Sequence, residues 1–490
     1  MKNAKRFMAL GLAMMLAVST AACGGAENAS GENTEKSGSV STEHRDFTIG
    51  SWWRQYYDST DENMEVSSDW ENAQFTDADD EATRAEKEVN QKVALAKWDK
   101  VKTLEEKYNC TFSWQNLTYA GTQESINTSI LAGSPDCDIY MVDTTMAVPA
   151  QANGLLVDLK TILPEDDDIF TDQSVFSYLD LGDGKACIIK VQGGFENTYP
   201  LGFNKQMLDD AKLEDPRDLY ERGEWTWDKF IEYCQALTQD TDKDGQIDQY
   251  GFCGYQSDML NALLMSNGNA TICGGTTCTL GDTKVGEALQ MMQDMFVKYN
   301  VCYPYDFAGE GGSPSDSMRN QYNEGNIAFF PAAVWIMNSN GNYPAGKEGN
   351  LTWDTCFVQW PVGPSGSKET NTGVNAAGGN FFVIPAGVKD PATVYQFLFD
   401  LYNWFDYDTS LRDNPATVNW WYQETAKVTE INDANFEVQK WSLQRPSFEL
   451  YESLGVEYDL ESLIRGDVTP AQFQETYKQP FQDALNAMFN

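Results

Sequence analysis

Apolar residues recur along this chain at two spacings, which together predict a mixed α/β protein. Residues 83–108 predict a long helix, because their apolar side chains recur near helical spacing: Val89, Val93, Val101, Leu104 and Tyr108. Short apolar runs predict strands on either side of that helix, at 47–53 and 135–143. This order of strand, helix and strand is typical of a parallel sheet covered by helices.

The same patterns predict further elements along the rest of the chain. Thr226 and Asp390 stand where helix N-caps are expected, each just before an apolar periodic segment. Pro480 is expected to kink or divide the last helix. The other predicted elements are strands at 186–191 and 381–384 and helices at 286–299 and from residue 470 onward.

The first residues have the pattern of an export signal. A basic start is followed by an apolar run at 7–18, and small residues lead into Cys23. This resembles the bacterial lipobox, with Thr20 where Leu is usual. We therefore expect a signal peptide at 1–22 and an acyl chain such as palmitate on Cys23. The alternative is an ordinary secretory signal that is cut near Ala22.

Residues 23–46 contain almost no apolar side chain and are expected to form a flexible tether after the acylated cysteine. No later stretch reaches the ~18 apolar residues that a membrane span needs. The expected location is the extracellular side of the cell membrane, or the periplasm where an outer membrane exists. Membrane contact would be through the lipid anchor only.

Charge and histidine content exclude several function classes. The formal net charge of -40 over 490 residues opposes nucleic acid as a partner. The only histidine is His44, within the expected tether, so Ser-His-Asp and Cys-His catalysis are excluded from the folded body. An enzyme would have to use carboxylates, as glycoside hydrolases do. That alternative stays open, but no pair of carboxylates can be nominated.

Nine cysteines follow Cys23, scattered and without a CxxC pair, which suggests neither a disulfide scaffold nor a zinc site. Cys273 and Cys278 are the closest pair and could bridge a loop. Cys234 falls on the apolar face of a predicted helix and is expected in the core.

An acidic loop at 240–251 resembles an EF-hand loop. Gly251 stands where the bidentate Glu is expected, so any Ca²⁺ would bind weakly, at about 10⁻⁴ to 10⁻³ M, and would be structural. The alternative is a solvated acidic turn, and no cofactor is otherwise expected. The candidate metal ligands are Asp240, Asp242, Asp244, Gln246 and Asp248.

Seven segments in order resemble those of one known family. Residues 223–230 (GEWTWDKF) resemble its TW-(D/E)-x-F helix entry, and 240–252 resemble its acidic loop ending in Tyr-Gly-Phe. Residues 464–470 (IRGDVTP) resemble its C-terminal GxxTPEEA segment. The others lie at 199–208, 323–330, 360–364 and 378–381. The chain resembles the extracellular solute-binding proteins of bacterial ABC importers, in the group that includes maltose-binding protein.

The resemblance implies an α/β, two-lobed periplasmic-binding-protein-like fold with a hinge and an interlobe cleft. Lobe one is placed at 47–193 plus 370–408, and lobe two at 194–369 plus 409–490. The solute would lie in the cleft, and binding would favour closure because only the closed state contacts it from both lobes. The closed form, expected to be a monomer, would deliver the solute to permease subunits in the membrane.

Sugar binding combines aromatic faces with polar edges, since rings stack on C–H faces while polar groups bond the hydroxyls. Aromatic and polar residues at strand ends and crossovers are therefore the candidates, and the resemblance also points to Trp335 and the segment 254–258. An oligosaccharide is the first choice of solute. The alternatives are a cationic solute such as a polyamine or basic peptide, and a surface adhesin or sensor with this fold. The expected ligand-binding residues are Trp52, Trp53, Asp143, Glu196, Asn197, Tyr255, Gln256, Asp258, Trp335, Gly379, Asn380, Trp420 and Trp421.

Overall fold

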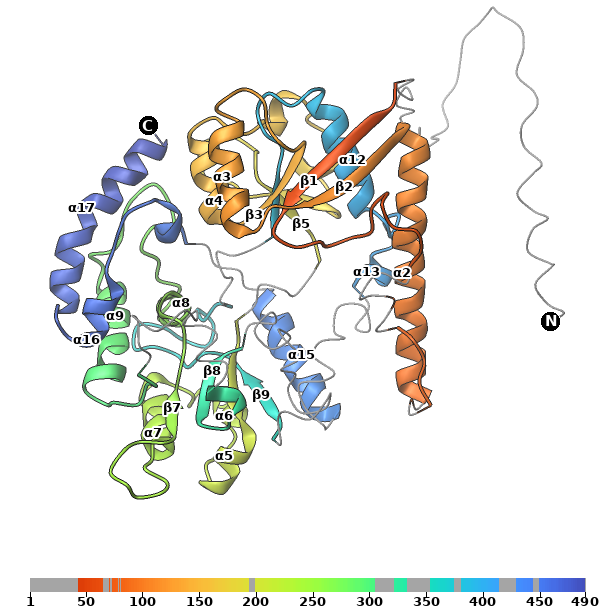
Figure 1. The fold of residues 1–490 in the computed structure, drawn as a ribbon. Coiled ribbons are helices and arrows are strands. Elements are labelled where there is room, and N and C mark those ends of the chain that lie inside the picture. The colour runs from red at the N-terminus through yellow and green to blue at the C-terminus, as the bar shows by residue number, and fades with distance from the viewer. Residues whose placement is uncertain are drawn as a thin grey trace, which may run out of the picture. The chain divides into compact units, whose positions relative to one another are not determined.

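The computed structural model describes residues 43–64, 70, 73–77, 79, 81–193, 199–304, 321–332, 353–373, 380–413, 429–443 and 449–489. The predicted signal peptide, the acylation of Cys23 and most of the predicted tether lie outside these residues. Within them the strands form two sheets, one of six strands and one of four, both flanked by helices (Figure 1). No helix in these ranges combines the length and apolar composition that crossing a bilayer requires.

The first sheet has the order β2-β1-β3-β10-β5-β4. β1 and β3 are parallel, as predicted, and β2, which was not predicted, is also parallel to β1. β10 runs antiparallel to both β3 and β5. The predicted long helix is α2 (Glu81–Tyr108), between β1 and β2. The strands are β1 (Arg45–Ser51), β2 (Cys110–Asn116), β3 (Ile139–Val142), β4 (Phe176–Tyr178), β5 (Ile189–Val191) and β10 (Phe381–Val383).

The first strand begins two residues earlier than predicted, inside the segment expected to be a tether. The Arg45 N–H donates to the Asn109 carbonyl at 3.2 Å, and its guanidinium pairs with Asp138 at 2.8 Å. Its cation also lies 4.4 Å from the centre of the Phe47 ring. These contacts to distant residues extend the strand, and local composition does not reveal them.

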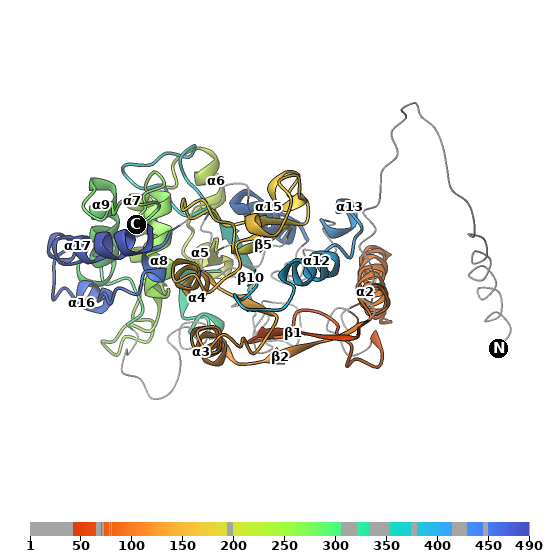
Figure 2. The ribbon, with the colours of Figure 1, turned by 90° about the horizontal axis from the view of Figure 1, so that it is seen from above.

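Two helices cover one face of the first sheet. α12 (Pro391–Tyr402) follows its predicted cap, in which Asp390 accepts a hydrogen bond from the Thr393 N–H. The ring of Phe397 on α12 stacks on that of Phe47 on β1, with centroids 4.3 Å apart. α12 also packs against α2, its neighbour in both Figure 1 and Figure 2. The opposite face is covered by α3 (Tyr119–Ser129) and α4 (Thr144–Ala152).

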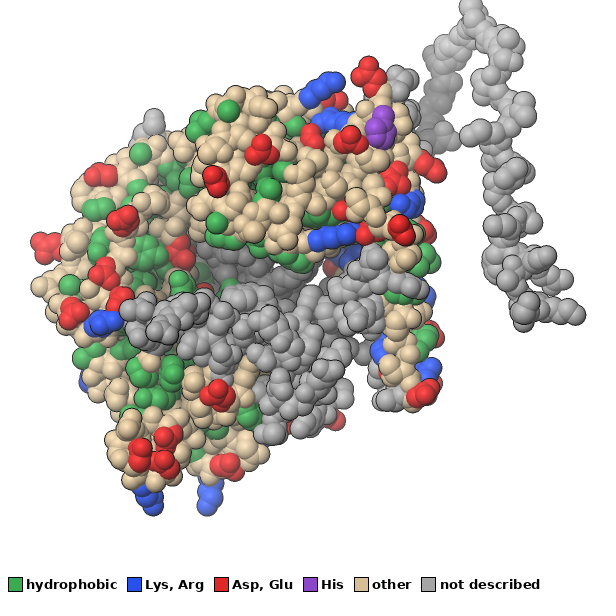
Figure 3. Space-filling model, in the orientation of Figure 1, with side chains coloured by type: hydrophobic (Ala, Val, Ile, Leu, Met, Phe, Trp, Pro, Cys, Tyr) green, Lys and Arg blue, Asp and Glu red, His purple; other side chains and the backbone are tan. Residues whose placement is uncertain are grey.

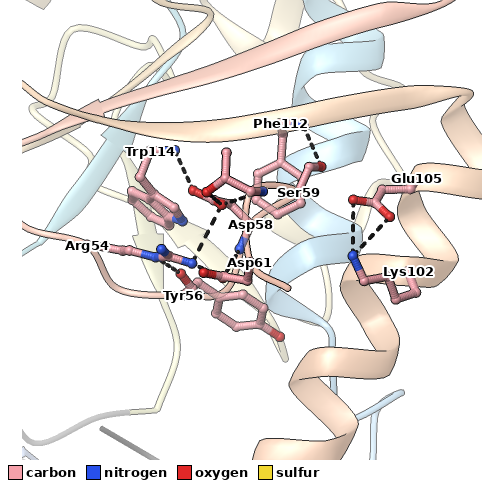
Figure 4. A network of polar contacts seen from close by, with 10 residues as sticks. Arg54, Tyr56, Asp58, Ser59, Asp61, Lys102, Glu105, Phe112 and Trp114 are labelled. Carbon is pink, nitrogen blue, oxygen red and sulfur yellow. Dashed lines mark hydrogen bonds and ion pairs between the residues drawn. The ribbon is translucent and has the colours of Figure 1, made fainter. Parts of the chain in front are cut away.

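The segment after β1 covers the open edge of β2 (Figure 4). Ser59 N–H donates to the Phe112 carbonyl at 3.0 Å, and Phe112 N–H donates back to the Ser59 hydroxyl at 2.9 Å. The buried Asp58 carboxylate accepts from Trp114 N–H, and Arg54 pairs with Asp58 and Asp61. An edge strand left open would be a template for aggregation, and this network closes it.

The second sheet has the order β7-β8-β6-β9. α15 (Thr429–Leu443) packs on the edge strand β9. Its buried Asn435 accepts from the Phe357 N–H at 2.6 Å and donates to the Thr355 carbonyl at 2.9 Å, as a neighbouring strand would. The strands are β6 (Leu201–Asn204), β7 (Tyr250–Phe252), β8 (Ile327–Pro331) and β9 (Thr355–Val358).

Helices pack around this second sheet and form most of the larger core. Thr226 caps α7 as predicted, accepting from the Lys229 N–H, and Cys234 on that helix is fully buried. The other helices here are α5 (Lys205–Asp210), α6 (Pro216–Glu221), α7 (Trp227–Leu237), α8 (Gln256–Ser266), α9 (Thr283–Val297), α16 (Leu460–Arg465) and α17 (Pro470–Phe489).

The last helix is not divided at Pro480, because α17 continues through it to Phe489. α4, from the first sheet, packs against both α17 and η5 (Tyr451–Ser453). The strands of the first sheet come from residues 45–191 and 381–383, and those of the second from 201–358. The predicted lobe boundaries themselves stay a prediction. The remaining elements are α13 (Thr409–Arg412), η2 (Leu159–Thr161) and η3 (Asp168–Phe170).

Candidate binding site

Asp143 lies where β3 ends and α4 begins, and both elements fix its carboxylate. One oxygen accepts from the Met146 N–H at 3.0 Å and from the Thr145 hydroxyl at 2.6 Å, which is an N-cap arrangement. The other oxygen accepts from the Tyr119 hydroxyl at 2.6 Å. Asp143 is buried, whereas Tyr119 is 47% exposed, so the pair has one side in the protein and one in solvent.

Aromatic rings border this carboxylate. Trp52 follows β1, and its ring meets that of Tyr119 edge-on, with centroids 5.4 Å apart at 70°. Burial, together with the bond to Asp143, raises the pKa of Tyr119 to about 12, so the phenol keeps its proton at neutral pH. The site therefore offers a ring edge and a fixed acceptor side by side.

A second group of polar residues belongs to α8 and η5. Asp258 stands in the first turn of α8, and Tyr255, at its N-cap position, is 42% exposed. One turn further on, the Asn261 amide donates to Glu452 of η5 at 2.8 Å. This places a carboxylate from the C-terminal part of the chain against a helix that lies almost 200 residues earlier.

The charge of one carboxylate affects the ionisation of its neighbour in two cases within these two groups. Burial, and then the charge of Glu452, raises the pKa of Asp258 to about 7. Burial also raises the pKa of Glu452, and the charge of Asp143 contributes to that rise. Since α4, which Asp143 caps, packs against η5, the chain brings all three acids to one region.

The buried carboxylate of Glu449, here called the Glu449 clamp, holds η5 in place. Glu449 is 6% exposed, and its carboxylate accepts from the backbone N–H groups of Ile272 at 2.5 Å and Cys273 at 2.7 Å. It also accepts from those of Leu450 at 2.8 Å and Tyr451 at 3.1 Å. Four donors on one carboxylate fix the start of η5 against the loop that follows α8, and so position Glu452.

The structure brings several predicted site residues together. Trp52 and Asp143 belong to the first group, and Tyr255 and Asp258 to the second. Asn380 precedes Phe381, which pairs with Val142 on the adjacent antiparallel strand, so the register places Asn380 next to Asp143. Gln256 begins α8, and Trp53 is 40% exposed beside Trp52. Outside the described residues lie Glu196, Asn197, Trp335, Gly379, Trp420 and Trp421.

Sequence reasoning missed Tyr119, Asn261 and Glu452. Tyr119 had a signal, because it begins the helix that follows β2. β2 is parallel to β1, so its end lies at the edge where Trp52 was expected. Asn261 looks like an ordinary helix residue, and Glu452 follows no motif. Their role depends on contacts between α8 and η5, which no local pattern encodes.

A cavity of about 1220 Å³ lies elsewhere in the described residues. It is lined by the end of α6, the start of α7, one side of α9 and residues 362–369, and it contains none of the predicted ligand-binding residues. Its basic residues are neutralised, since Arg222 pairs with Glu214 and Glu224 and Lys368 pairs with Glu221. The residues predicted to bind the solute therefore do not coincide with this cavity.

In the acidic loop between α7 and β7, three of the five predicted metal ligands lie close together. One oxygen from each of Asp240, Asp242 and Asp244 lies within 4.8 Å of the others. Asp248 instead accepts from Thr241 and from the Asp242 N–H, and Gln246 donates its N–H to Asp244. Figure 3 shows acidic side chains gathered at the lower left of the molecule, where this loop lies. Three converging carboxylates fit a weak Ca²⁺ site, which stays a prediction.

The described cysteines are all buried and free, so the bridge considered between Cys273 and Cys278 is absent. Both lie in the loop that the Glu449 clamp organises, since Glu449 accepts from the Cys273 N–H. Hydrogen bonds hold that loop without a covalent link.

The fold and the site define a class of protein. The two α/β sheets, with the chain passing from the first to the second and back, are those of a two-lobed, periplasmic-binding-protein-like solute-binding protein. The family model for bacterial extracellular solute-binding proteins matches residues 100–403. The chain belongs to that family. No curated protein sequence matches it.

Solved structures share this fold at low sequence identity. The ABC substrate-binding protein of Listeria monocytogenes in complex with cycloalternan has a TM-score of 0.55 at 17% identity, covering 80% of this chain and 96% of its own. The maltose/maltodextrin-binding domain of Bdellovibrio bacteriovorus, bound to maltotriose, has a TM-score of 0.54 at 14% identity, covering 90% and 100%. The Streptomyces glaucescens GacH receptor, solved with acarbose, has a TM-score of 0.52 at 15% identity, covering 90% of this chain and 98% of its own.

Proposed function

We propose that this protein captures an extracellular saccharide, an oligosaccharide in the first instance, and delivers it to an ABC permease. The observation that carries the proposal is the junction of Trp52, Tyr119 and Asp143, where aromatic rings border a fixed carboxylate at a strand end. Rings stack on the C–H face of a sugar while carboxylates accept from its hydroxyls. The saccharides bound by the three structural relatives agree with this choice.

The capture step needs no bond to be made or broken. The site contains residues of α3 and α4 on one side and of α8 and η5 on the other, so a bound solute contacts both groups. Binding therefore favours the arrangement in which these groups approach each other. A carrier of this kind releases the same molecule that it takes up.

A panel of oligosaccharides tests the proposal by thermal shift and calorimetry. A ligand that binds only the folded state raises the melting temperature. Trp52→Ala is expected to weaken binding about tenfold, and the exposed Phe75→Ala serves as a matched aromatic control. Release of hydrolysis products from a bound glycan would reject the carrier and favour a carboxylate enzyme instead.

We also propose that Cys23 carries an acyl chain and holds the protein at the outer face of the membrane. Labelling of cells with an alkyne palmitate analogue tests this directly. The wild-type protein is expected to take the label and stay with membranes, whereas Cys23→Ser is expected in the soluble fraction. Equal labelling of both proteins would reject the anchor.

A further inference from the structure

The candidate site contains an excess of negative charge. The charge of Glu452 acts on Asp258 and that of Asp143 acts on Glu452, and within the part of the chain that the structure describes none of the three is ion-paired with a Lys or Arg. Asp258 has no hydrogen-bond donor there either, whereas Asp143 and Glu452 accept from Tyr119 and Asn261. Charged groups with little access to water are normally paired, so this arrangement lacks a cation.

An independent observation points to a missing partner in the same place. Three side chains beside Glu452 are almost fully buried: Asn261 at 5% exposed, Tyr451 at 1% and Ser453 at 2%. Of these, Asn261 Oδ1 and the Ser453 hydroxyl have no hydrogen-bond partner within the described residues. Buried polar atoms in native proteins are nearly always satisfied, because each unmade bond costs about 1–3 kcal/mol.

This region therefore contains more hydrogen-bond acceptors than donors. The Asp258 carboxylate and Asn261 Oδ1 both accept, and the Ser453 hydroxyl can accept as well as donate. A sugar hydroxyl brings one donor and no charge. A protonated primary amine brings three donors and one positive charge, so a single group satisfies several acceptors and offsets the repulsion between the acids.

We propose that the bound saccharide carries a protonated amino group, held between Asp258 and Glu452 beside Asn261. This inference rests on the proposed function and narrows its substrate class to amine-bearing sugars. The net charge of -40 favours the approach of such a cation over long range. The rings of Trp52 and Tyr119 would contact the sugar face while the acids bind its amine.

Matched pairs of sugars that differ at one group provide the test. The probes are glucosamine against glucose, galactosamine against galactose, and the glucosamine trimer against its N-acetylated form and cellotriose. Titration calorimetry at pH 6.5 is expected to show a 10- to 100-fold preference, about that of one charge-assisted site, for the amine within any pair that binds. A neutral sugar bound as tightly as its amine would overturn the inference and leave the proposed function standing.

Isosteric variants test the assigned acids. Asp258→Asn and Glu452→Gln keep the shape and remove one charge each, so the preference for the amine is expected to fall at least tenfold while any affinity for the neutral sugar persists. Asp99→Asn, an exposed charge on α2, is the control and should retain the preference. Retention of the preference in both site variants would refute the assignment.

The remaining outcomes separate the two proposals. Binding of spermidine but of no sugar would reject the saccharide and retain the ammonium site. Binding of neither an amine nor a sugar in the panel would reject both. Circular dichroism of each variant distinguishes a lost site from a lost fold.

Discussion

Asp258 shows at the residue scale how a site charge affects stability. Its pKa is about 7 in the folded chain, against a usual 3.8, because burial and the charge of Glu452 disfavour the ionised form. Between these two values the folded state binds more protons than the unfolded state does. The free energy of unfolding therefore falls as the pH rises from about 4 to about 7.

Replacing this acid should remove that loss. Asp258→Asn cannot ionise, so we expect it to be more stable than the wild type by about 1–3 kcal/mol at pH 7.5, after allowance for partial solvent access, and equal to it at pH 4. Urea denaturation at the two pH values measures the difference. A variant that is less stable at pH 7.5 would mean that the ionised carboxylate has a stabilising partner.

Glu449 differs from Asp258 in its hydrogen bonds: burial raises its pKa to about 7 as well, but its carboxyl group accepts four backbone N–H bonds. Glu449→Ala leaves these donors without an acceptor, and we expect a loss of about 3 kcal/mol or more in unfolding free energy. Glu461→Ala on α16 removes an exposed pair with Arg465 and should cost less than about 1 kcal/mol. Similar losses of unfolding free energy in the two variants would contradict the stabilising role of the Glu449 clamp.

At the element scale, the loop between α7 and β7 is a self-contained test case. Ca²⁺ at a few millimolar is expected to raise the melting temperature of the wild type, because three carboxylates converge there. The double variant Asp242→Asn, Asp244→Asn should lose this effect. Mg²⁺ at equal concentration controls for screening, since it is held poorly by such loops. Identical responses of wild type and variant to Ca²⁺ would end the prediction.

Elements with local signals were predicted well. Thr226 and Asp390 cap their helices as expected, because a cap is formed by residues within one turn. The parallel strands near Asp143 also follow from patterns within each segment. Pro480 does not divide the last helix, since α17 continues past it despite the missing donor, and the kink considered there stays a prediction. The resemblance supplied the two-lobed architecture that patterns alone could not.

The candidate site was only half predictable for the same reason. Asp143 and Trp52 stand at strand ends, which short apolar runs in the sequence locate. Glu452 enters the site because Glu449 fastens η5 to a loop some 177 residues earlier. Such a contact is a product of packing between distant segments, and only the folded chain reveals it.

At the scale of the whole molecule, charge is the dominant feature. The chain has 74 acidic and 34 basic residues, and many of its ion pairs are exposed. Exposed pairs contribute little, so they do not offset the repulsion among the remaining acids. That repulsion acts on the folded state and on every charged solute that approaches it.

Salt should therefore have opposite effects on the stability of the free protein and on its affinity for an amine-bearing sugar. Raising NaCl from 10 to 200 mM shortens the screening length from about 30 to about 7 Å, which reduces the self-repulsion, so we expect the melting temperature of the free protein to rise. Over the same range an amine-bearing sugar should bind more weakly, mainly through slower association, while a neutral sugar keeps its affinity. Stopped-flow fluorescence of the site tryptophan measures both rates. If the amine and the neutral sugar respond equally to salt, the charge of the site has no part in selecting its solute.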